Sequence, residues 1–71
     1  MINNLEKRYN IWITLEYNLL ENTKKYYSRL INRTTLQASK DVYQKRLNEA
    51  IKSHNRKINW LKKELTKVKH P

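Results

Sequence analysis

Apolar residues recur at alternating steps of four and three along the second half of the chain. They are Leu47, Ile51, Ile58, Leu61, Leu65 and Val68, with His54 as the one polar member of the series. This spacing is typical of the buried stripe of an amphipathic helix. The chain has no glycine and its one proline is Pro71, so the commonest helix-breaking residues are missing. The pattern predicts long helices and an all-α fold.

The first half of the chain carries two apolar stripes side by side. The first stripe comprises Ile2, Leu5, Tyr9, Trp12, Leu19, Tyr26 and Leu30, with Glu16 and Thr23 as polar members. The second comprises Ile13, Tyr17, Leu20, Tyr27 and Ile31, and Ile11 and Leu15 widen the apolar surface further. A helix that is apolar over so wide an arc is normally covered on several sides. We expect the first stripe to face the second helix and the surplus surface to meet another molecule.

A β-strand is the alternative for residues 11–17, where apolar and polar residues also alternate with a period of two. Several of these residue types are common in strands. No turn residues bracket the segment as a strand would need, so the helix is the favoured interpretation.

The middle of the chain is polar where the helical stripe should continue. The residues at those positions are Arg33, Gln37, Lys40 and Gln44. Neighbouring Asn and Thr side chains compete for backbone hydrogen bonds and favour turns and helix caps. The sequence therefore predicts one domain over residues 1–71, an antiparallel two-helix hairpin with a first helix at about 4–31, a turn at about 32–36 and a second helix at about 36–69. One continuous helix is the alternative, because the seven-residue phase runs unbroken through the middle.

Candidate caps mark the predicted helix ends. Asn3 with Glu6 three positions later resembles a capping box at the start of the first helix. Asn32 is placed to close that helix, and Thr34 or Thr35 to cap the second.

A turn centred on Thr35 pairs residues whose numbers sum to 70. Trp12 then meets Ile58, Leu19 meets Ile51, and the two polar interruptions Glu16 and His54 face each other. Because they oppose each other, we expect Glu16 to bond His54 across the hairpin. A carboxylate that gains such a cationic hydrogen-bond partner has a lowered pKa.

The chain is too short to bury a large core by itself. It has 71 residues and no cysteine, so no disulfide supplements the packing. We expect self-association through the apolar first helix to supplement this small core, giving a homodimer that forms a four-helix bundle. A different protein partner on the same surface satisfies the same requirement.

Enzyme chemistry is not expected. The two histidines, His54 and His70, have no cysteine or carboxylate at metal-ligand spacing, and the absence of glycine excludes phosphate-binding glycine loops. We expect no catalytic residue, no metal and no cofactor. Glu16 interrupts the most apolar stretch, so we expect no membrane span. A helix on a membrane surface is disfavoured because packing can satisfy the apolar stripes, so we expect no membrane partner and a cytoplasmic location.

Positive charge is the main indication of function. The chain has 16 Lys and Arg against 6 Asp and Glu, a net charge of +10, and favours polyanionic partners. Opposite the apolar stripe of the second helix lie Lys45, Lys52, Arg56, Trp60, Lys63 and Lys67. Cations neutralise phosphates, and an indole among them can stack on an unpaired base.

These residues predict a small basic nucleic-acid-binding accessory protein, for DNA or RNA, that contacts phosphates through its second helix. The alternative is a protein-interaction regulator or inhibitor of the phage or plasmid type. Its apolar first helix would dock on a host protein, and its charge would match an acidic surface. A plainer interpretation of the cations is a solvated helix face, although such faces usually mix both signs of charge.

Overall fold

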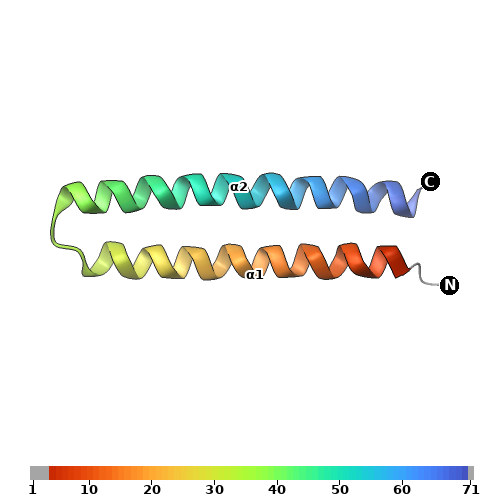
Figure 1. The fold of residues 1–71 in the computed structure, drawn as a ribbon, viewed down its shortest axis with the longest axis horizontal. Helices are drawn as coiled ribbons and strands as arrows, with labels where there is room; N and C mark the ends of the chain where they lie inside the picture. The colour runs from red at the N-terminus through yellow and green to blue at the C-terminus, as the bar shows by residue number, and fades with distance from the viewer. Residues whose placement is uncertain (1–3, 71) are drawn as a thin grey trace.

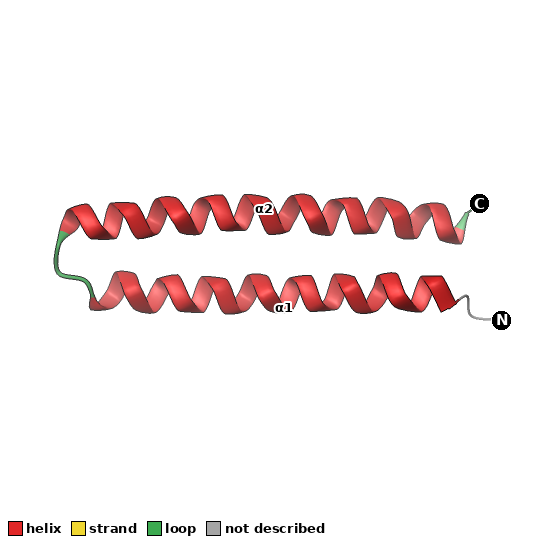
Figure 2. Cartoon of the chain, in the orientation of Figure 1, coloured by secondary structure: helices red, strands yellow, loops and turns green. Residues whose placement is uncertain are grey.

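The computed structural model describes residues 4–70, which form two long antiparallel helices. Helix α1 spans Asn4–Arg33 and helix α2 spans Gln37–Lys69. The two helices lie side by side along their whole length, with both chain ends at the same end of the molecule (Figure 1). Figure 2 shows a single loop between them. The predicted all-helical hairpin is confirmed, whereas both the continuous helix and the strand at residues 11–17 are wrong.

The turn consists of residues 34–36. The Thr34 N–H donates to the Leu30 carbonyl at 3.1 Å, which continues the hydrogen-bond pattern of α1, and α1 runs two residues past the expected end at 31. Leu36 occupies the N-cap of α2 with extended φ and ψ of −83° and 124°, and no side chain caps the helix. The prediction of a Thr34 or Thr35 cap is therefore wrong, because both threonines precede the N-cap position. The predicted cap Asn3 lies outside the described residues.

The core between the helices is thin. Its buried apolar residues are Leu20, Leu47, Ile58 and Leu61. Three of these four belong to the predicted stripe of α2, which does face α1. The radius of gyration is 16.4 Å, against about 11 Å for a compact domain of this length. An extended two-helix shape leaves most side chains in contact with solvent.

The face of α1 that packs on α2 differs from the expected one. Trp12, Leu19 and Tyr26 are 44, 51 and 59% exposed, whereas Leu20 is buried and Tyr27 is half-buried. The prediction that the first stripe faces α2 is therefore wrong at these positions, and the neighbouring residue in the second stripe turns inward instead. Both stripes repeat every seven residues and lie next to each other, so spacing alone cannot choose between them. Packing against α2 decides the rotation of α1.

We expect Ile58→Ala to lower the free energy of unfolding by about 2–4 kcal/mol, because it empties a site that is 2% exposed in a core of few residues. The measurement is chemical denaturation followed by circular dichroism. Leu36→Ala is the matched control, since Leu36 is 68% exposed in the turn, and we expect a change within about 0.5 kcal/mol. Equal effects of the two substitutions would contradict the described core.

Candidate functional site

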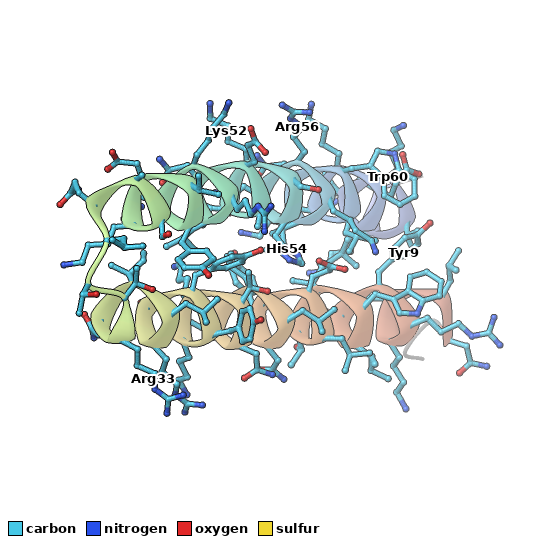
Figure 3. All side chains as sticks on the ribbon, turned by 60° about the vertical axis from the view of Figure 1, so that its left-hand side comes forward. Tyr9, Arg33, Lys52, His54, Arg56 and Trp60 are labelled. Carbon is cyan, nitrogen blue, oxygen red and sulfur yellow. The ribbon has the colours of Figure 1, made fainter. Side chains whose placement is uncertain are left out.

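A buried carboxylate joins the two helices near their middle. Glu16 on α1 is 5% exposed, and its Oε2 accepts a hydrogen bond of 2.8 Å from Nδ1 of His54 on α2. Its Oε1 accepts from Nζ of Lys57 at 2.8 Å. Burying an unpaired carboxylate would be costly, but both oxygens have donors. The predicted contact of Glu16 with His54 is confirmed, and Figure 3 shows His54 between the two helices.

Lys57 is the partner that sequence reasoning missed. It follows His54 by three residues, so both side chains lie on the same side of α2 one turn apart. The Lys57 hydrogen bond is the main cause that lowers the pKa of Glu16, and the His54 hydrogen bond adds to it, while burial acts in the opposite direction. The three-residue spacing of Lys57 from His54 could have identified it as a second donor to Glu16.

This cluster ties the two helices together. Each oxygen of the Glu16 carboxylate accepts one hydrogen bond from α2, at 2.8 Å in both cases. No group of three metal-binding side chains occurs in residues 4–70. Neither α1 nor α2 is long and apolar enough to cross a membrane.

The predicted cations of α2 lie on the helix surface that faces away from α1, which we call the outer face of α2. Its members are Lys45, Lys52, Arg56, Lys63 and Lys67, all exposed. Lys52 and Arg56 point away from α1 in Figure 3. Lys67 bonds Glu64 at 3.1 Å, while the other four form no ion pair within the described part of the chain.

Trp60 lines a groove between the helices, and Arg56 and Lys63 lie about one turn from it along α2. The groove has a volume of about 480 Å³ and is lined by Trp12, Leu15, Glu16, Leu19, Lys57, Trp60 and Leu61. The structure therefore brings Trp60 together with apolar residues of α1, and none of the five cations of the outer face lines this groove. The indole is still 55% exposed.

Three of the six acidic residues, Glu16 among them, are engaged by cations outside the outer face. Glu6 pairs with Lys69 at 3.8 Å, and Glu21 with Lys24 at 3.4 Å. Lys62 lies over the ring of Tyr17, 5.3 Å from its centroid. Four of the five cations of the outer face therefore carry a charge that no carboxylate of the described chain neutralises.

A second basic stripe, on α1, was missed by the sequence reasoning. Lys25, Arg29 and Arg33 follow one another at steps of four and are exposed, with no ion pair among the residues that the structure describes. Arg33 points away from α2 in Figure 3. The four-residue spacing was the signal that would have identified it. Any test of the outer face of α2 therefore needs this stripe as a comparison.

Comparisons with known proteins bring no assignment. No protein family matches this chain, and neither a curated protein nor a solved structure is similar to it.

Acid should weaken the hairpin through Glu16. Its pKa in the folded protein is lowered from the ordinary value of 4.5, so its stabilising contribution is fully present above that value and is lost as pH falls through the lower folded pKa. We expect Glu16→Gln to cost on the order of 1–3 kcal/mol at neutral pH and to remove this part of the acid dependence below pH 4.5. The measurement is the free energy of unfolding at a series of pH values.

Glu21→Gln is the matched control, because Glu21 is an exposed carboxylate that bonds only the exposed Lys24 on the same helix. It should retain the acid dependence of the wild-type protein. If Glu16→Gln gave a pH profile parallel to that of the wild type, the Glu16 contacts would not contribute in solution.

Proposed function

We propose that the protein binds nucleic acid through phosphate contacts on the outer face of α2. The observation that carries the proposal is the set of four exposed cations, Lys45, Lys52, Arg56 and Lys63, which have no carboxylate partner among residues 4–70. A cation that already pairs with a carboxylate would contribute less binding free energy to a phosphate contact, because that pair must first be broken. Release of the counterions condensed on a nucleic acid favours binding by unpaired cations.

The arrangement favours binding that is independent of base sequence. From Lys45 to Lys67 the outer face extends over about 33 Å of straight helix, since each residue adds about 1.5 Å. Its side chains are of the kind that contact backbone phosphates, which position a protein on a duplex or strand without identifying bases. We therefore propose an accessory role on DNA or RNA, in the cytoplasm, where these polyanions are accessible.

We also propose that the hairpin works as a homodimer forming a four-helix bundle. The support is the thin core, in which only Leu20, Leu47, Ile58 and Leu61 are buried apolar residues of the described chain. A core of this size is small for a chain without disulfides, and a second hairpin would enlarge it.

The competing function is docking on an acidic protein. It predicts no binding to random oligonucleotides at low salt, whereas the proposed function predicts binding there.

Arg56→Ala or Lys63→Ala should weaken binding to a random oligonucleotide about equally for all base sequences. Each should also reduce the slope of log affinity against log salt by about one unit, because one fewer phosphate is neutralised. The measurement is a fluorescence titration at several salt concentrations, with melting temperatures recorded in parallel to confirm that the variants fold.

Arg29→Ala on α1 is the matched control for Arg56→Ala. Both arginines are exposed and lack an ion pair in the described chain, so the two substitutions remove the same charge from different helices. We expect the smaller loss for Arg29→Ala. Equal losses would place the site elsewhere, and absence of binding by the wild-type protein at about 50 mM salt would refute the proposed function.

A further inference from the structure

One lateral surface of the hairpin is apolar and lies open. We call it the groove face and define it by Trp12, Leu15 and Leu19 of α1 and Trp60 of α2, which line one groove. Their exposed fractions are 44, 52, 51 and 55%. A contiguous exposed apolar patch that includes two tryptophans is typical of an interface between macromolecules.

Charge identifies the partner that this face suits. Residues 9–23 form the longest stretch of the chain without Lys or Arg, and they carry Glu16 and Glu21. Lys57 is the only cation that lines the groove, and its ammonium group already bonds Glu16 at 2.8 Å. An acidic partner or a phosphate chain would find no unoccupied cation in this groove. A second molecule of net charge +10, by contrast, can approach here with the least repulsion.

We propose that a second copy of this chain packs on the groove face, about a two-fold axis that crosses α1 near Leu15 and Leu19. This inference rests on the proposed homodimer and names its interface. A two-fold interface uses the same patch on both subunits, and a patch centred on leucine side chains is complementary to itself. A stable dimer of standard size buries about 800 Å² per subunit, roughly one seventh of the 5855 Å² accessible surface of the hairpin.

Pairing through the groove face would leave the cations of the outer face of α2 accessible. The outer face of α2 points away from α1, so it stays accessible on both subunits when the groove faces meet. The dimer would carry two basic surfaces, one on each subunit. Trp60 would be covered by the partner and would stabilise the dimer, in place of stacking on a base.

The first test compares the mass of variants by sedimentation equilibrium at micromolar concentration. The wild-type protein should have twice the 8.7 kDa monomer mass. Leu19→Lys should raise the dimer dissociation constant about a hundredfold, because symmetry introduces each substitution twice. Asn18→Lys adds the same charge at the adjacent exposed residue, away from the groove lining, and should leave the dimer intact.

The second test avoids variants that fail to fold when the dimer is lost. The chain has no cysteine, so Leu15→Cys and Leu19→Cys each introduce a single thiol. Oxidation of a mixture of these two variants should give disulfide-linked dimers, since residues close to the axis approach within disulfide distance. Asn18→Cys should not cross-link under the same conditions.

The outcomes separate this inference from the proposals on which it rests. A wild-type dimer that survives Leu19→Lys, or that cross-links through Asn18→Cys and not through Leu15→Cys or Leu19→Cys, would overturn this interface while leaving the dimer standing. A folded wild-type monomer would refute both the dimer and its interface. Nucleic-acid binding is judged independently, by the effect of Arg56→Ala.

Discussion

The buried carboxylate of Glu16 is the interaction on which the arrangement of the hairpin depends. An ionised carboxylate can be placed between two helices only if donors meet both of its oxygens, and His54 and Lys57 do so at 2.8 Å each. A shift of α2 by one turn would separate these donors from Glu16 and leave a buried charge unpaired. Apolar side chains repeated every seven residues would tolerate such a shift far better. Polar pairing therefore defines the register that the thin apolar core leaves open.

The positions of charge and apolar surface follow from the same register. With Glu16 held against α2, Leu20 turns into the core, while Trp12 and Leu19 remain at its edge. The cations opposite the core of α2 are exposed, and among them only Lys67 pairs with a carboxylate of the described chain. The hairpin thus separates an apolar lateral face from a basic outer face. The proposed dimer contact and the proposed polyanion site would therefore use different faces.

Much of the fold could be predicted from the sequence, because its signals are local. The regular stripe of α2 from Leu47 to Val68, the missing glycines and the polar centre together indicated two helices and a turn. The contact of Glu16 with His54 followed from counting residues on either side of that turn. The rotation of α1 could not be predicted, since two neighbouring stripes have the same period. That rotation decides which α1 residues line the groove beside Trp60. The sequence had placed Trp60 among the cations because it lies opposite the apolar stripe of α2.

The turn has a consequence for how freely the connection can vary. Residues 34–36 join the helices without a side-chain cap on α2, and no described residue has a positive φ. No residue type is therefore required there by backbone conformation, and the register is held by a contact many residues away. We therefore expect a peptide inserted in this connection to disturb the pairing of the helices less than one inserted within α1 or α2.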